Sequence, residues 1–291
     1  MQNNIEKSPF DAYLPKDIAR IVENIGVAKA NLDFWSMFVL AILGGVFVAL
    51  GSELFIFVIH DSKFSFGITN FLGGLAYSLG TILIVIAGAE LFNSNNLIVM
   101  AYMDRKISLT KVLRNWCIVF LGNFLGAISV VIWVYFAKYW SFNESLVGAK
   151  ALLIAHDKVT HTFLQAFAQG VICNALVCLA VWLCYGGHSV TDKILSVILP
   201  TTAFVTLGYE HTVANMYFIP LGLILKNHPE VIQAAGRITE GVVEVAQLTL
   251  KNYLFRNMLP VTLGNIFGGS VLVGVVYWFI YLRKKHHKLV Y

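Results

Sequence analysis

The chain of 291 residues is 58% hydrophobic and 13% charged, and its mean hydropathy is +0.73. Soluble globular domains carry about one quarter charged residues, so the composition excludes a soluble domain and predicts an integral membrane protein. The net charge of +5 at pH 7 does not indicate a nucleic-acid partner, because the basic residues gather beside apolar segments, where they face lipid headgroups.

Residues 1–33 form a polar amino-terminal segment with too many acids for a signal peptide, so we expect the next span to be retained. An amphipathic helix is predicted from Pro15, because Ile18, Val22 and Ile25 follow helical spacing. Such stripes are common on helices that lie on the membrane surface. A lid over a pore or a docking site for a partner is the alternative.

Six apolar regions follow, each long enough to span a bilayer, and together they predict one transmembrane domain over residues 34–282. They occupy residues 34–59, 66–102, 113–138, 162–186, 194–225 and 258–282. Of the 21 Lys and Arg residues, 13 fall on the side of the termini and 8 on the other. Cytoplasmic loops carry the excess of basic residues. We therefore expect a multi-pass protein of the cell inner membrane with both termini in the cytoplasm, including the basic tail 283–291.

The second and fifth apolar regions are too long for simple spans. As single helices they would measure roughly 55 Å and 48 Å, against a hydrocarbon core of about 30 Å. The second loses its apolar character around Glu90, where several Asn residues cluster, and the fifth does so beside Gly208. We predict that both helices are broken and that the freed backbone lines a cavity.

The chain also repeats itself. Asn115 and Asn123 recur as Asn257 and Asn265 at a shift of 142 residues, each pair with flanking glycines. Glu90 and Asn95 recur as Glu210 and Asn215 at a shift of 120. Two halves of three spans each are predicted, and because an odd number of spans separates them, the halves are inverted in the bilayer.

The fifth region places Glu210, His211 and Asn215 in an apolar context. Such groups are costly in hydrocarbon unless they are paired or face a wet cavity, so an intramembrane ionisable residue marks a functional site. We interpret His211 as the polar centre of a transport pathway. Glu90 and Glu210 are expected to be structural, accepting hydrogen bonds from exposed amides or capping helix ends.

All four cysteines fall within apolar regions: Cys117, Cys173, Cys178 and Cys184. Neither a disulfide framework nor a zinc site has this distribution. We expect them to pack as small apolar residues, and we expect no metal and no cofactor.

Several segments resemble the formate/nitrite transporter family, and most of all its bacterial formate channels. They are Ala87–Ser94 (AGAELFNS), His156–Phe163 (HDKVTHTF), Gly170–Ala180 (GVICNALVCLA), Gly208–Asn215 (GYEHTVAN) and Asn257–Asn265 (NMLPVTLGN). The resemblance extends from Phe10 to Tyr281, nearly the whole chain. The segments 10–15 and 259–269 look like those of formate channels and favour formate over nitrite.

The resemblance implies a homopentamer of aquaporin-like six-helix protomers, each with its own pore. By similarity, His211 is the central pore histidine, Asn215 is its hydrogen-bond partner and Lys158 is a vestibule lysine that attracts anions. Other positions similar to pore residues of the family are Asn174 near the centre, Asn93 in the loop after the broken helix, and Tyr77, Thr81, Leu91, Phe92 and Phe204 at the constrictions. Three of these depart from the family pattern, since Asn93 replaces a common Thr, Tyr77 a usual Phe and Thr81 a usual Leu.

These features predict a channel for small monovalent anions, formate first, with nitrite, hydrosulfide, acetate or lactate as alternatives. The anion would meet His211 at mid-membrane and pass the apolar rings either transiently protonated or partly dehydrated, since stripping its water without a partner costs several kcal/mol. A neutral-solute channel would suit the same layout. An intramembrane enzyme that uses His211 and Glu210 is a poor alternative, because adjacent helical residues point about 100° apart and no nucleophile lies against a base.

Overall fold

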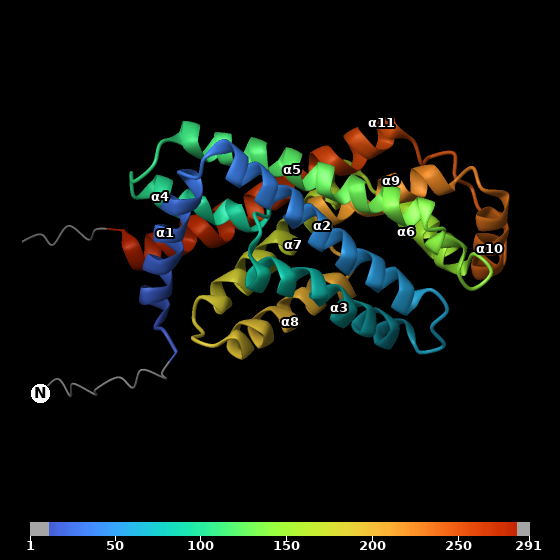
Figure 1. Ribbon diagram of the computed structural model, residues 1–291, viewed down its shortest axis with the longest axis horizontal. Coiled ribbons are helices and arrows are strands. Elements are labelled where there is room, and N and C mark those ends of the chain that lie inside the picture. The colour runs from blue at the N-terminus through green and yellow to red at the C-terminus, as the bar shows by residue number, and fades with distance from the viewer. Residues whose placement is uncertain (1–11, 284–291) are drawn as a thin grey trace, which may run out of the picture.

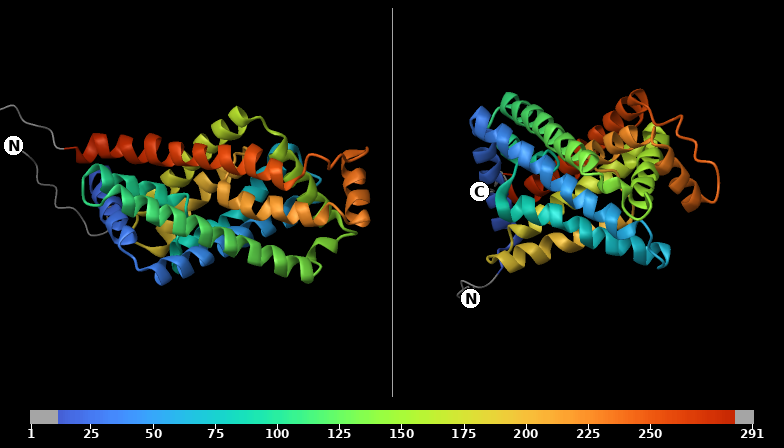
Figure 2. Two further views of the ribbon diagram at one scale, coloured as in Figure 1. Left: turned by 90° about the horizontal axis from the view of Figure 1, so that it is seen from above. Right: turned by 45° about the vertical axis from the view of Figure 1, so that its right-hand side comes forward.

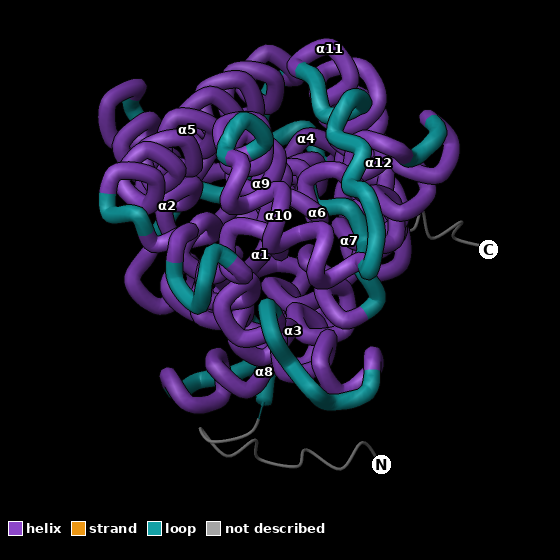
Figure 3. Tube along the Cα trace, turned by 90° about the vertical axis from the view of Figure 1, so that its right-hand side faces the viewer, coloured by secondary structure: helices purple, strands orange, loops and turns teal. Residues whose placement is uncertain are grey.

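The computed structural model describes residues 12–283, and every regular element in that range is helical. Figure 3 shows the resulting packing of helices and short loops. The main helices are α1 (Pro15–Ala30), α2 (Phe34–Ile59), α3 (Phe66–Leu83), α5 (Leu109–Phe136), α6 (Leu146–Thr160), α7 (Phe163–Cys184), α8 (Val190–Thr206), α9 (Thr212–Leu225) and α10 (Pro229–Thr239). The basic tail, apart from Arg283, and the first eleven residues lie outside the described range.

Two segments are less regular than the rest. A π-helical turn, Ile84–Gly88, ends α3, and the chain then passes through a 3-10 turn, Ser94–Ile98, into the short α4 (Val99–Met103). The carboxyl-terminal segment Leu250–Leu282 is continuously helical. It comprises α11 (Leu250–Asn252), α12 (Leu259–Ile266) and π-helical stretches at Tyr253–Met258, Phe267–Val275 and Trp278–Leu282.

Within residues 12–283, five helical segments have the length and apolar composition to cross a membrane. They are Phe34–Ile59, Phe66–Gly88, Leu109–Phe136, Phe163–Cys184 and Leu250–Leu282. The fifth apolar region of the sequence is divided between α8 and α9, which are 17 and 14 residues long and are separated by residues 207–211. The chain is therefore an all-helical protein with the apolar helices of a membrane protein.

Helix α1 packs against protein along its apolar stripe. Pro15 opens the helix, and Ile18 and Val22 are buried in a cluster with Leu97 and Trp182. The stripe therefore does not face lipid, as a helix lying on the bilayer surface would require. A buried carboxylate on the same helix, Glu23, is paired with Lys106 at 2.6 Å, and burial raises the pKa of Glu23 despite this cation.

The views agree on how the ends of the chain are placed. Helix α1 and the carboxyl-terminal end of the last helix lie at the same end of the molecule (Figures 1 and 2). Helices α3 and α8 run side by side (Figure 1), and Gly74 of α3 faces the backbone of Thr202 of α8.

Glycines bring two helix pairs into backbone contact. A Cβ atom on Gly126 of α5 would lie 2.0 Å from the carbonyl oxygen of Ile42 in α2. A Cβ atom on Gly268 of the last helix would lie at the same distance from the carbonyl oxygen of Val171 in α7. Small residues allow membrane helices to approach this closely, where dispersion contacts stabilise their association.

We predict that Gly126→Ala lowers the thermal unfolding midpoint of the protein in detergent. The added methyl group would collide with rigid backbone, so α2 and α5 must separate. The control is Gly67→Ala in the first turn of α3, because a Cβ atom there meets nothing within 4 Å and alanine favours helix by about 1 kcal/mol. Equal midpoints for the two variants would contradict the close contact.

Candidate functional site

Two irregular crossovers bring the polar residues of the sequence into the helical bundle. In the first, Gly88 has φ of 84° and leads the chain from α3 towards Asn93; in the second, Gly208 has φ of 71° and leads it from α8 to α9. Only glycine adopts this left-handed region without strain. At both places the chain therefore turns sharply, and the glutamate two residues further on, Glu90 or Glu210, is buried.

An asparagine on a neighbouring helix secures each crossover. The Asn123 amide donates to the carbonyl oxygens of Ala41 (2.7 Å) and Glu90 (2.9 Å), and its Oδ1 accepts from the Phe92 backbone (2.9 Å). The Asn265 amide donates to the carbonyl oxygens of Gly170 (2.8 Å) and Glu210 (3.0 Å), and its Oδ1 accepts from the Thr212 backbone (2.9 Å). Both asparagines are fully buried.

A buried carboxylate stands at the second crossover. Glu210 is 1% exposed and pairs with Lys158 at 2.9 Å. Its other oxygen accepts from the amides of Asn215 (2.5 Å) and Asn257 (2.9 Å), and Asn257 also donates to the carbonyl oxygen of Lys158 (2.8 Å). A buried carboxylate is tolerated when it is paired and hydrogen-bonded in this way.

The first crossover carries the same arrangement. Glu90 pairs with Lys29 of α1 at 2.8 Å and accepts from the Asn95 amide at 2.5 Å. Asn95 in turn contacts Lys29 (2.9 Å) and Asn115 (2.9 Å). The two glutamates are therefore structural acceptors, each bound to one lysine and at least one amide.

Lys158 occupies the last turn of α6, where the sequence suggested a loop. It is not a free cation, because its ammonium is paired with Glu210 and lies 5.6 Å from the centre of the Phe218 ring. The sequence also gave no reason to single out Lys29, which has the equivalent role at the first crossover. Asn115, Asn123, Asn257 and Asn265 were visible in the repeat, but their bonding was not.

His211 forms the N-cap of α9. Its Nδ1 accepts from the Ala214 backbone at 3.1 Å. A ring nitrogen that accepts carries no proton, so the imidazole in this arrangement is neutral and carries its proton on Nε2. Among the described residues no hydrogen bond is found to Nε2. Asn215, expected as a side-chain partner of this ring, directs its amide to Glu210 and Asn257 instead.

Aromatic rings surround the imidazole. Phe204 stacks on His211 with ring centres 5.7 Å apart, and Tyr77 meets Phe204 edge to face at 5.8 Å. These three side chains line one wall of a cavity of about 150 Å³, which Lys158 and Phe218 also line. The sequence-predicted residues Lys158, His211, Tyr77 and Phe204 therefore meet in one place.

The remaining predicted residues lie elsewhere. Asn93 and Asn174 are fully buried and hydrogen-bonded to each other (3.1 Å) and to Asn265. Thr81 accepts from Thr201 across the α3 and α8 contact (3.3 Å). Leu91 and Phe92 are 3% exposed, and the Phe92 ring packs edge to face on Phe120 and Trp116 of α5. Neither of them lines the cavity beside His211.

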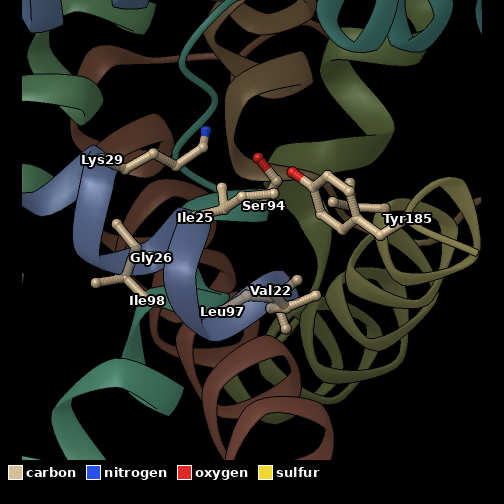
Figure 4. A pocket seen from close by; sticks show the side chains of 9 residues that line it. Val22, Ile25, Gly26, Lys29, Ser94, Leu97, Ile98 and Tyr185 are labelled. Carbon is tan, nitrogen blue, oxygen red and sulfur yellow. The ribbon is translucent and has the colours of Figure 1, made fainter. Parts of the chain in front are cut away.

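A second cavity of about 270 Å³ lies at the first crossover, beside α1. Its polar lining comes from Lys29, Glu90, Ser94, Tyr185 and Lys193. Figure 4 shows three of these, Lys29, Ser94 and Tyr185, around the adjoining recess.

Each of the two cavities, of about 270 and 150 Å³, has room for a small polar solute. Within residues 12–283, no group of three or more His, Cys, Asp and Glu side chains is arranged to hold a metal ion. The lysine, imidazole N–H and hydroxyl groups that line the two cavities are hydrogen-bond donors, and they suit an anion or its conjugate acid.

The chain is similar to known proteins over nearly its whole length. The family model for formate/nitrite transporters matches residues 16–279. The formate channel FocA of Escherichia coli (strain K12) is 39% identical over 283 residues, which cover 96% of this chain and 98% of that protein. The formate channel FocA of Haemophilus influenzae is 37% identical, and the alignment covers 98% of this chain and 100% of that protein. A solved structure described as a pentameric formate channel with formate bound is 40% identical, with a TM-score of 0.77 over 86% of this chain and 98% of that one.

We predict that Asn265→Asp destabilises the protein by on the order of 3 kcal/mol, because the aspartate cannot donate to the two buried carbonyl oxygens at the second crossover. The thermal unfolding midpoint in detergent measures the effect. Asn227→Asp is the matched control and should leave the midpoint unchanged, because Asn227 is exposed and no hydrogen bond of its side chain is found in the described part of the chain. A midpoint unchanged in Asn265→Asp would show that the crossover does not depend on this side chain.

Proposed function

Because the chain belongs to the formate/nitrite transporter family, we propose that it is a membrane channel for small monovalent anions, with formate as its principal substrate. The names of its relatives support formate. The observation in this chain that carries the proposal is the His211 ring, whose Nδ1 is engaged by the α9 backbone. Its Nε2–H is thereby left for a solute in a cavity that Lys158 also lines.

We propose that the protomer has six spans in two inverted halves of three, with the second and fifth helices broken at Gly88 and Gly208. The matched hydrogen bonds of Asn123 and Asn265 support it, as do the matched contacts of Gly126 and Gly268. The fifth span would then combine α8 and α9. Both described ends of the chain at one end of the molecule fit an even number of spans.

The assembly and location follow from the same family membership. A solved relative is described as pentameric, and we propose a homopentamer in the cell inner membrane with both termini in the cytoplasm. The larger number of basic residues on the side of the termini supports that orientation. In this orientation the cavity beside His211 opens away from the cytoplasm and the cavity beside α1 opens towards it.

The mechanism begins with an anion in the cavity beside Lys158. The ammonium is neutralised in part by Glu210, so it attracts the anion without holding it as an isolated cation would. The His211 Nε2–H then donates a hydrogen bond that replaces part of the lost hydration, and the amino-terminal end of α9 adds its positive dipole. Beyond this point the solute passes the rings of Tyr77 and Phe204 either partly dehydrated or as the neutral acid.

Nitrite and hydrosulfide are alternatives within the same family, and a neutral-solute channel is the alternative outside the anion class. A neutral solute is not attracted by the positive charge of Lys158. Its flux would therefore ignore substitution of the lysine and the charge of the solute.

We predict that His211→Asn abolishes most formate flux, because the imidazole N–H and its proton chemistry are lost from the cavity. Uptake of formate, nitrite, hydrosulfide and lactate into proteoliposomes, with and without a pH gradient, measures the effect. His156→Asn is the control, since this histidine lies two residues from Lys158 but does not line the cavity. Unchanged flux and pH dependence in His211→Asn would remove this residue from the mechanism.

We predict that Lys158→Gln lowers both formate flux and stability, because it leaves the Glu210 carboxylate buried without its cation. The double variant Lys158→Gln/Glu210→Gln separates the two effects. It should recover the unfolding midpoint while formate flux stays at least about tenfold below wild type, the loss expected for one hydrogen bond to a charged group. Flux restored together with stability would assign Lys158 a structural role only.

A further inference from the structure

The cavity beside α1 contains a cation that the proposed function does not use. Lys193 lies in the first turn of α8 and lines this cavity of about 270 Å³ together with Lys29 and Glu90. Its side chain is half-buried. In the repeat of the sequence, no lysine of the other half corresponds to Lys193. The two crossovers therefore differ in this residue.

The two lysines of the cavity differ in their bonding. Lys29 is held by Glu90 at 2.8 Å and Asn95 at 2.9 Å, so its charge is compensated. No hydrogen bond or ion pair to the Lys193 ammonium is found within residues 12–283. The ammonium acts electrostatically on the Cys184 thiol, which lines the same cavity. An unpaired charge therefore faces a partly enclosed space.

Helix stability does not account for this lysine. The amino-terminal turn of a helix carries the positive end of the macrodipole, so a cation there is disfavoured. The favourable residue of that turn, Asp192, already completes a capping box with Ser189. Lys193 thus adds positive charge where the helix already supplies it, which raises the potential of the cavity.

Two hydroxyls complete the polar lining. Ser94 follows the first crossover and Tyr185 follows α7, and both line the recess that Lys29 also lines (Figure 4). Ser94 donates to the carbonyl oxygen of Leu91 at 3.1 Å and keeps its lone pairs. No hydrogen bond of the Tyr185 hydroxyl is found in the described part of the chain. This hydroxyl is therefore a donor for a ligand.

Of the two cavities, only the one beside α1 has a net positive charge among its lining residues. Lys29, Glu90 and Lys193 sum to one net positive charge beside α1. In the cavity beside His211, the charge of Lys158 is opposed by Glu210 and by Asp157, which is a lining residue. An anion is therefore held more strongly beside α1, where the low dielectric of the surrounding helices strengthens the attraction.

We propose that Lys193 and the Tyr185 hydroxyl form a binding site for small monocarboxylate anions in the cavity beside α1. The ammonium and the phenol donate to the carboxylate oxygens, while the apolar side chains of Leu40, Ile84 and Val181 enclose the rest of the ligand. This site rests on the proposed anion channel and gives it a loading point on the face of the termini, with a higher affinity than on the other face.

The first test measures the half-saturating formate concentration separately on each face, in right-side-out and inside-out membrane vesicles. Lys193→Gln should raise it about tenfold on the α1 face only, the loss expected for one charge-assisted hydrogen bond, and Lys193→Arg should retain most of the affinity. The control is Lys16→Gln, an exposed lysine on the same face. Equal behaviour of Lys193→Gln and Lys16→Gln, or an equal change on both faces, would overturn the proposal.

The second test does not depend on transport. Formate should raise the thermal unfolding midpoint of the purified full-length protein, because a ligand that binds the folded state stabilises it. The rise should persist in His211→Asn and be smaller in Lys193→Gln, where only the weaker binding beside His211 is left. A rise of wild-type size in Lys193→Gln would refute the site even in an active channel, whereas a rise reduced only in Lys193→Gln, in a protein without flux, would refute the channel and keep the site.

Discussion

The structure depends on one constraint, which is that the backbone amide and carbonyl groups at the two crossovers must find hydrogen-bond partners. An amide or carbonyl group without a partner costs several kcal/mol in hydrocarbon, so irregular backbone persists at membrane depth only where protein groups satisfy it. Asn123 and Asn265 meet this requirement, each with two donated bonds and one accepted bond to crossover or neighbouring backbone. Because these bonds hold Glu90 and Glu210 in place, the polar cluster at each crossover depends on them.

The polar clusters at the two crossovers also compensate their buried charges in the same way as each other. Each glutamate is buried beside one lysine and at least one amide, which is what keeps an ion pair tolerable away from water. The pairing consumes most of the hydrogen-bonding capacity of these residues. The groups left over, chiefly the His211 Nε2–H on one side and the Lys193 ammonium on the other, are therefore the ones that can meet a solute.

The two crossovers share one arrangement of hydrogen bonds but differ in the groups left over. Helix contact through glycine and crossover bonding through asparagine are found at both places. The surplus groups line two different cavities and need not match. Substitution of one of these glycines or asparagines should therefore affect stability first, whereas substitution of a surplus residue should affect the solute first.

The sequence by itself determined the membrane class, the helical fold and the positions of most apolar segments. It also showed that Glu90 corresponds to Glu210, and Asn123 to Asn265, in the repeat. These follow from composition, length and regular spacing, which are local properties of the chain. Only the tertiary structure decided that α1 covers protein, that Lys29 completes the first cluster, and that the Asn215 amide binds Glu210 and not the His211 ring. Such contacts join residues that lie far apart along the chain or compete for one partner, and distance in space alone decides between them.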